Sequence, residues 1–308
     1  MSNPAERLPS VVCECGATIV SDEFVPSSRG GAPNASGFDS CLRRCQVCGI
    51  GFSNCKNPSE IITILRDAFD GLPAYVAEGC DRALVECLNQ SHVRKKQADF
   101  QSLSSEDHVS WTVMRFLQHE RLLGQVFRHS DIEPVLLIWG VPVPNSNSEG
   151  WALRQKIITV CDHLKEQPRF HSEPDVLLDF GEAGIVLVEA KLWSPNEFKE
   201  QSYGGWVKYL KHAAFRDSDS ARAIGYYQLV RNWRIGCELA GERPITLVNL
   251  GLGFTRDEAR KLACLRLSLR TSFRRLFVVR RWSSLLRGVT VPTWLSEYSR
   301  RRTLALAE

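Results

Sequence analysis

The chain has 308 residues, of which 44% are hydrophobic and 24% charged, the proportions of an ordinary globular protein. This composition excludes disordered and fibrous proteins, and no apolar run approaches the roughly 20 residues that a membrane-spanning helix needs. The first residues contain no apolar segment of the secretory type. We therefore expect a cytoplasmic protein with no membrane partner.

The charge is distributed unevenly. The net charge of the whole chain is +4, yet residues 256–302 contain thirteen Lys and Arg residues and only three acidic ones. Such an asymmetry predicts an anionic partner for the C-terminal part. A solvated helix face is the alternative interpretation.

Six of the eleven cysteines fall within the first 55 residues. In a reducing compartment such a cluster indicates a metal site rather than disulfide bonds. Two pairs are each followed by Gly, which allows a tight turn whose backbone amides face the thiolates. We predict a structural Zn²⁺ site of the zinc-ribbon type, with Cys13, Cys15, Cys45 and Cys48 as ligands. Cys41 and Cys55 are alternative ligands, because the first pair is spaced one residue shorter than the second.

Composition and apolar periodicity divide the chain into three segments. Residues 1–58 are expected to form the zinc-ribbon-like domain, which is rich in Gly, Ser, Pro and Asn. Residues 59–101 are expected to be a helical linker, with apolar stripes at 61–69 and 83–88. Its last part, 92–101, is a polar connector. Residues 102–308 are expected to be a third segment, a larger domain with a basic C-terminal extension, whose type depends on the motifs described below.

Helices and short apolar strands alternate after residue 102. Helices are expected after the capping-box sequence Ser104-Ser-Glu-Asp107 and at 151–165, 197–215, 220–239 and 256–270. Strands are expected at 134–143, 175–180, 185–191, 245–250 and 276–279. This order predicts an α/β fold with a mixed sheet.

The most informative motif spans two predicted strands joined by the turn Gly181–Gly184. If the residues flanking this turn face each other, Asp175 lies opposite Ala190 and beside Glu189 and Lys191. Side chains alternate along a strand, so Glu189 and Lys191 share one face. Charges at the end of a buried strand are costly without partners. Two carboxylates that share a divalent cation beside a lysine would suit phosphodiester hydrolysis.

Pro174-Asp175 and Glu189-Ala-Lys191, on successive strands of an α/β unit, resemble the PD-(D/E)xK nuclease superfamily. The resemblance covers roughly residues 102–255. It implies a restriction-endonuclease-like mixed sheet flanked by helices. It also implies a catalytic Mg²⁺ (or Mn²⁺) at Asp175 and Glu189, with Lys191 acting on the nucleophile or the phosphate.

The resemblance extends to two helices. Superfamily members commonly carry an acidic residue on a preceding helix, which assigns a metal-site role to Glu106, with Asp107 as the close alternative. A later helix often supplies a Gln or Tyr, which gives Gln228 a supporting role and makes Arg231 a phosphate contact. The expected catalytic residues are Glu106, Asp175, Glu189, Lys191 and Gln228.

We therefore expect a metal-dependent nuclease that acts on DNA, with RNA as an open alternative. The basic region after Arg256 would hold the nucleic-acid backbone non-specifically. The resemblance suggests a role in defence or restriction of foreign DNA, as a homodimer or as a subunit of a defence complex. The second hypothesis is a nucleic-acid-binding or adaptor protein that retains a nuclease fold without activity.

Overall fold

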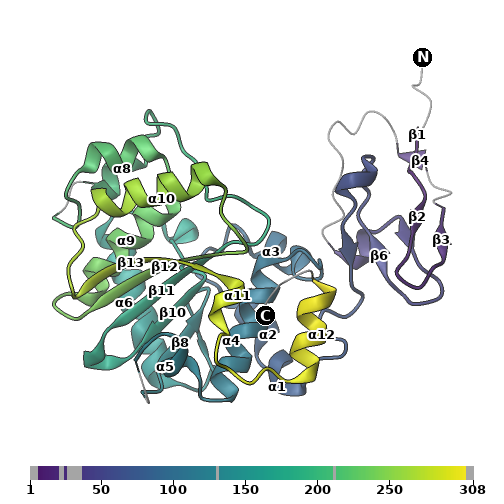
Figure 1. Ribbon diagram of the computed structural model, residues 1–308, viewed down its shortest axis with the longest axis horizontal. Coiled ribbons are helices and arrows are strands. Elements are labelled where there is room, and N and C mark those ends of the chain that lie inside the picture. The colour runs from purple at the N-terminus through teal and green to yellow at the C-terminus, as the bar shows by residue number, and fades with distance from the viewer. Residues whose placement is uncertain (1–5, 21–23, 26–36, 130–131, 211–212, 303–308) are drawn as a thin grey trace. The chain divides into compact units, whose positions relative to one another are not determined.

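A computed structural model describes residues 6–20, 24–25, 37–129, 132–210 and 213–302 (Figure 1). The chain divides into two compact units, Met1–Leu72 with Arg94–His108, and Pro73–Val93 with Val109–Glu308. This division differs from the boundaries expected at residues 58 and 101. Half of the expected linker belongs to the second unit, because apolar side chains such as Val76 and Ala83 are fully buried there.

The first unit is built from very short strands. These are β1 (Glu6–Arg7) paired with β4 (Phe24–Val25), β2 (Val11–Val12) paired with β3 (Thr18–Ile19), and the antiparallel sheet of β5 (Arg43–Arg44), β6 (Gly51–Phe52) and β7 (Thr63–Ile64). The helix α3 (Val93–Asp99) comes later in the chain. One small apolar cluster includes Cys13, Ile19, Cys45, Ile50 and Phe52. So small a core contributes little to the stability of the fold.

Two local predictions for this region are wrong. The stripe at 61–69 does not form a helix, because Thr63–Ile64 pairs with Gly51–Phe52 as strand β7. The polar run at 92–101 is mostly the helix α3 and is not an irregular connector. In both places contacts with distant parts of the chain outweigh the local pattern.

A six-stranded mixed sheet forms the centre of the second unit. Its strands are β8 (Val135–Ile138), β9 (Val141–Val143), β10 (Val176–Asp179), β11 (Ile185–Ala190), β12 (Ile245–Gly251) and β13 (Arg275–Arg281). The spatial order is β13-β12-β11-β10-β8-β9. The neighbours β11, β12 and β13 are parallel, and the remaining pairs are antiparallel. The predicted α/β class with a mixed sheet is confirmed.

The single strand expected at 134–143 is a hairpin. Strands β8 and β9 turn at Trp139 and Gly140, whose φ angles are 51° and 76°. Two consecutive residues with positive φ make a tight turn whose twist suits a hairpin. The apolar run contains no Asn-Gly or Asp-Gly signal, so its composition does not mark this turn.

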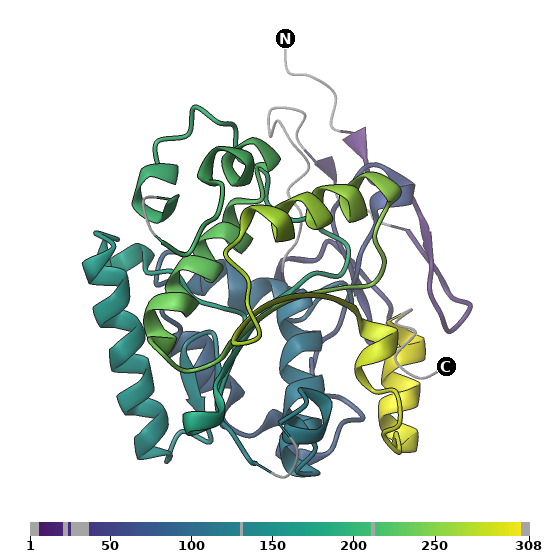
Figure 2. The same ribbon diagram turned by 60° about the vertical axis from the view of Figure 1, so that its left-hand side comes forward.

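Helices cover both faces of the sheet (Figure 2). They are α1 (Ala74–Ala77), α2 (Cys80–Glu86), α4 (Glu106–His119), α5 (Leu123–Val126), α6 (Ser148–His163), α7 (Trp206–Leu210), α8 (Ser218–Ile224), α9 (Tyr227–Ala240), α10 (Arg256–Ser268), α11 (Trp282–Leu285) and α12 (Thr293–Arg301). Short 3-10 turns lie at Phe38–Ser40, Pro58–Glu60, Pro168–Phe170 and Gly181–Ala183. Helices α6 and α9 lie on one face of the sheet and α4 on the other (Figure 2).

Side-chain caps fix where two of these helices begin. At α10, Thr255 and Glu258 form a reciprocal capping box. At α4, the Ser105 hydroxyl accepts a hydrogen bond from the His108 backbone N–H at 3.2 Å. The cap of α4 is therefore Ser105, one residue later than the predicted box starting at Ser104.

A large core cluster lies between the sheet and the α6–α9 layer. On the sheet, residues of five strands contribute to it, among them Leu137, Leu177, Leu187, Leu247 and Phe277. Alternation continues along β11, so Glu189 points to this same face. The sheet thus brings its charged residues to the end of a buried layer beneath α9.

Candidate functional site

Four cysteines of the first unit form a compact cluster. The sulfur atoms of Cys13, Cys15, Cys45 and Cys48 all lie within 4.8 Å of one another. The closest pairs are Cys13 with Cys48 at 3.2 Å and Cys15 with Cys45 at 3.5 Å. Zinc–sulfur bonds of about 2.3 Å place tetrahedral thiolates roughly 3.8 Å apart, close to this spacing. The cluster could therefore hold a metal such as zinc.

Tight turns aim these thiolates inward. Gly16 and Gly49 have positive φ angles of 84° and 70°, and the N–H of Gly49 donates to the carbonyl of Cys45 at 3.0 Å. Hydrogen bonds from the backbone N–H groups of Cys48 and Val47 lower the pKa of Cys45 to about 6. A thiolate that is already favoured at neutral pH is a ready metal ligand.

Cys41 and Cys55, the alternative ligands, lie outside this cluster. The Cys41 thiol donates to the carbonyl of Gly37, and the Cys55 thiol to the carboxylate of Glu60, both at 3.6 Å. Both are buried. Burial is the main cause that raises the pKa of Cys41 to about 11, which disfavours the thiolate that binds metal.

The second cluster lies where β10 and β11 meet. The predicted register is wrong by one residue, because Asp179 pairs with Ile185 and Val176 with Val188. The turn therefore takes in Phe180, whose N–H donates to the carbonyl of Gly184 at 2.9 Å. A shift of one residue changes the face of every side chain. Asp175 comes level with Glu189 instead of Ala190.

Asp175 and Lys191 both lie beside Glu189. The Ala190 backbone N–H donates to Oδ2 of Asp175 at 2.7 Å. The ammonium of Lys191 lies 2.6 Å from Oε1 of Glu189, whose side chain is only 1% exposed. The structure thus brings together the three residues of the sequence motif. Their arrangement joins two carboxylates and one ammonium at a single end of the sheet.

The backbone of Lys191 is held from two sides. Its N–H donates to the carbonyl of Leu250 at 2.7 Å, and its carbonyl accepts from the indole of Trp282 at 3.0 Å. The side chain of Lys191 is 13% exposed, compared with the 1% of Glu189. The lysine therefore lies between the buried carboxylate and the solvent.

Asn232 is a site residue that the sequence analysis missed. Its amide nitrogen donates to Oε2 of Glu189 at 2.7 Å, and both side chains are buried. Asn232 lies on α9, four residues after Gln228, so the two share one helical face. This spacing after a predicted site residue is a signal that could have identified it.

Asn249 is a second residue that was missed. Strands β11 and β12 are parallel and in register at Glu189 and Asn249, so both side chains point to the same face. Asn249 is fully buried, and neither amide atom has a hydrogen-bond partner among the described residues. Buried polar atoms nearly always have a partner. These two atoms are therefore available to a partner from outside the described residues.

The other predicted residues of α9 lie near this group. Gln228 is half-buried one turn before Asn232. Arg231 is also half-buried, and its Nε donates to Oδ1 of Asn232 at 3.4 Å. Burial lowers the pKa of Arg231, but nearby negative charges, Glu189 foremost, outweigh it and raise this pKa overall. Arg231 therefore contributes a fixed positive charge beside the carboxylate.

Glu106 and Asp107 begin helix α4 within the first unit, whereas the site around Glu189 belongs to the second. The side chain of Asp107 lies 3.5 Å from the ammonium of Lys96, which is itself buried. This ion pair gives Asp107 a structural role. The assignment of Glu106 to the metal site stays a prediction.

Within the described residues, no helix is both long and apolar enough to cross a lipid bilayer. No family model, curated protein or solved structure matches this chain. The function must therefore be inferred from the chemistry of the two clusters.

Proposed function

We propose that this chain is a metal-dependent nuclease of the PD-(D/E)xK type, with a restriction-endonuclease-like core, that hydrolyses phosphodiester bonds of DNA. The observation that carries the proposal is the contact of Lys191 with the buried Glu189, next to Asp175. A buried ion pair contributes little net stability, since the desolvation of both charges offsets their attraction. A functional role is a better reason for two charges at the end of an apolar strand.

The donor set suits a hard divalent cation. Carboxylate oxygens are the protein ligands that Mg²⁺ prefers, and the amide atoms of Asn249 lie buried without a partner among the described residues on the same face. Asp175 and Glu189 would hold the ion, with Glu106 as the proposed third ligand. When bound, the cation would neutralise negative charge on the phosphoryl group.

Other side chains have roles that their contacts suggest. Asn232 donates to Glu189 and would orient its carboxylate. Lys191, the more exposed partner of the ion pair, would hold the attacking water or a phosphate oxygen. Arg231 would add positive charge against the developing negative charge of the phosphate, and Gln228 would support the same face of α9. The cysteine cluster, with its zinc, would be structural.

Cleavage of plasmid and linear DNA in Mg²⁺ or Mn²⁺ tests this proposal. Asp175→Asn keeps the shape of the side chain but removes its charge, and we expect cleavage to fall at least about 100-fold. Lys191→Met should have a similar effect. The chain offers a matched control in Glu197-Phe-Lys199, an exposed pair with the same spacing and a 2.9 Å contact. The Lys199→Met variant should therefore cleave DNA at the same rate as the wild type.

Lys191→Met leaves Glu189 buried without its ion-pair partner, which can cost about 3–5 kcal/mol. Tryptophan fluorescence would check that the variant is folded, and Asp175→Asn remains informative if it is not. Equal cleavage by the wild type and Asp175→Asn would contradict the proposed site. DNA binding without cleavage by any form would support the second hypothesis, a catalytically silent nucleic-acid-binding protein.

The biological role is a further part of the proposal. A defence or restriction role against foreign DNA, in the reducing cytoplasm that suits the cysteine cluster, is what the resemblance to this superfamily suggests.

A further inference from the structure

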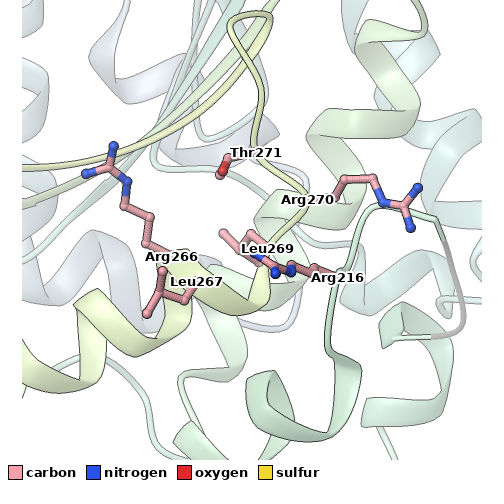
Figure 3. A pocket seen from close by; sticks show the side chains of 6 residues that line it. All are labelled: Arg216, Arg266, Leu267, Leu269, Arg270 and Thr271. Atoms are coloured by element: carbon pink, nitrogen blue, oxygen red, sulfur yellow. The ribbon is translucent and has the colours of Figure 1, made fainter.

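A pocket of about 390 Å³ in the second unit is lined by three arginines (Figure 3). Its lining residues are Arg216, Arg266, Leu267, Leu269, Arg270 and Thr271. None of these residues is acidic. Arg266 and Arg270 extend to opposite sides of the pocket, and Arg216 and Thr271 lie between them (Figure 3).

Backbone hydrogen bonds join the two chain segments that form this pocket. The N–H groups of Arg216 and Asp217 both donate to the carbonyl of Ser268, at 2.9 and 3.1 Å. In the other direction, the N–H of Arg270 donates to the carbonyl of Ala214 at 2.9 Å. Arg216 and Arg270 are far apart in the chain, and these backbone hydrogen bonds bring their segments side by side. The positions of their Cα atoms are therefore fixed by the fold.

Asp217, the acidic residue next to Arg216 in the chain, is not among the residues that line the pocket. Asp217 caps helix α8, and its carboxylate accepts hydrogen bonds from the N–H and the hydroxyl of Ser220, at 2.9 and 2.6 Å. All three arginines are exposed, and the guanidinium groups of Arg266 and Arg270 are directed to opposite sides of the pocket (Figure 3). Their long, flexible side chains can turn toward a bound anion. Arginine binds phosphate oxygens through two parallel N–H groups, and the Thr271 hydroxyl adds another donor.

The surface next to the pocket favours nucleic acid over other anions. The N–H groups of Ser272 and Arg275 exchange hydrogen bonds with each other's carbonyls, at 2.9 and 3.0 Å, and make a tight turn. The turn exposes Phe273, which is 86% accessible and has the guanidinium of Arg274 over its ring at 5.4 Å. An exposed aromatic ring with arginines around it suits a strand that offers both bases and phosphates.

We infer that the pocket formed by Arg216, Arg266 and Arg270 binds a backbone phosphate of nucleic acid at a distance from the carboxylate site. This inference rests on the proposed function for its ligand. Helix α10 has 13 residues and comes after β12, the strand that carries Asn249 near its end. The pocket is at the far end of that helix, which is about 20 Å long. A nucleic-acid strand that follows the length of the helix covers roughly six nucleotides at 3.4 Å each.

The test measures binding alone, by fluorescence anisotropy of a labelled 20-base-pair duplex in buffer without added divalent cations. The variant is Arg216→Ala with Arg270→Ala. We expect its affinity near 0.1 M salt to fall about tenfold, and the slope of log K against log salt to decrease in magnitude by about 1. Arg82→Ala with Lys156→Ala is the control, because it removes two positive charges from exposed positions on α2 and α6, outside the basic region, and it should change neither value appreciably.

Three outcomes would overturn the inference. One is an unchanged salt slope in Arg216→Ala with Arg270→Ala, and another is an equal loss of affinity in the control, Arg82→Ala with Lys156→Ala. The third is binding of dAMP or inorganic phosphate that depends on Arg216 and Arg270 while duplex binding does not, which would make a free phosphate compound the ligand. The cleavage assay is independent of all three, so failure of the nuclease and failure of the pocket are distinguishable.

Discussion

Asn249 shows how a single residue can lower the stability of the folded state. A buried amide without a hydrogen-bond partner costs about 1–3 kcal/mol, and Asn249 is fully buried with both amide atoms in this state among the described residues. Asn232, in contrast, uses its amide to donate to Glu189. The two asparagines lie on the same side of the sheet as this carboxylate but have opposite effects on the folded state.

Substitution by leucine separates these effects. Leu has the same branched shape as Asn and no polar atoms, so Asn249→Leu should raise the free energy of unfolding by about 1 kcal/mol. If Asn249 serves the proposed site, DNA cleavage should fall in the same variant. Urea denaturation and a cleavage assay measure the two quantities.

Asn232→Leu is the matched control, since it removes a partner that Glu189 uses. Its free energy of unfolding should fall by about 1–3 kcal/mol. A loss of stability in Asn249→Leu as well would mean that the Asn249 amide has a partner in solution.

Among the elements, the β10–β11 hairpin determines whether the carboxylates of Asp175 and Glu189 lie side by side. Gly184 ends its turn with φ of 126°, a region that other residues rarely adopt, and a Cβ there would lie 2.6 Å from the carbonyl oxygen of Pro244. That same oxygen accepts the hydrogen bond of the Ile185 N–H at 2.9 Å. The contact joins the start of β11 to the segment before β12 and so sets the register that aligns Glu189 with Asn249.

Gly184→Ala should therefore destabilise the second unit by about 2–4 kcal/mol. Gly181 lies in the same turn with φ of 62°, and nothing lies within 4 Å of a Cβ built there. Gly181→Ala should cost only about 1–2 kcal/mol, the strain of a left-handed residue. Denaturation monitored by tryptophan fluorescence compares the two variants, and equal losses would contradict this role of Gly184.

Over the whole molecule, the two units are stabilised in different ways. The second unit has an extensive apolar core around its sheet. The first has small clusters such as the one around Cys13 and Cys45, and a metal ion bound by the four cysteines would supply stability that so few apolar contacts do not. All eight tryptophans of the chain lie between Trp111 and Trp294, within the second unit.

This distribution allows metal removal to be monitored in each unit. We expect one zinc per chain by elemental analysis. A strong zinc chelator should make the cysteine-rich segment sensitive to proteolysis, while tryptophan emission changes little. Cys45→Ser should lose the metal, whereas Cys55→Ser should retain it, because Cys55 lies outside the cluster. Metal loss in Cys55→Ser would contradict the ligand set.

The sequence predicted much of the fold in the second unit. The strands at 185–191 and 245–250 and the helix at 256–270 agree closely with β11, β12 and α10, because their apolar runs and caps are strong local signals. Predictions were wrong where pairing with a distant segment decides the structure, as in β7. Within the expected helix at 197–215, the described residues are helical only in α7, Trp206–Leu210.

For the candidate sites, the sequence by itself identified most residues of the two clusters, since the cysteine pairs and the Asp175, Glu189 and Lys191 motif are defined by residue type and short spacing. Only the tertiary structure decided how these residues are placed relative to one another. It excluded Cys41 and Cys55 from the cysteine cluster, shifted the β10–β11 register by one residue, and added Asn232 and Asn249. The physical reason is that strand register and helix packing depend on contacts between residues far apart in the chain, which local patterns do not contain.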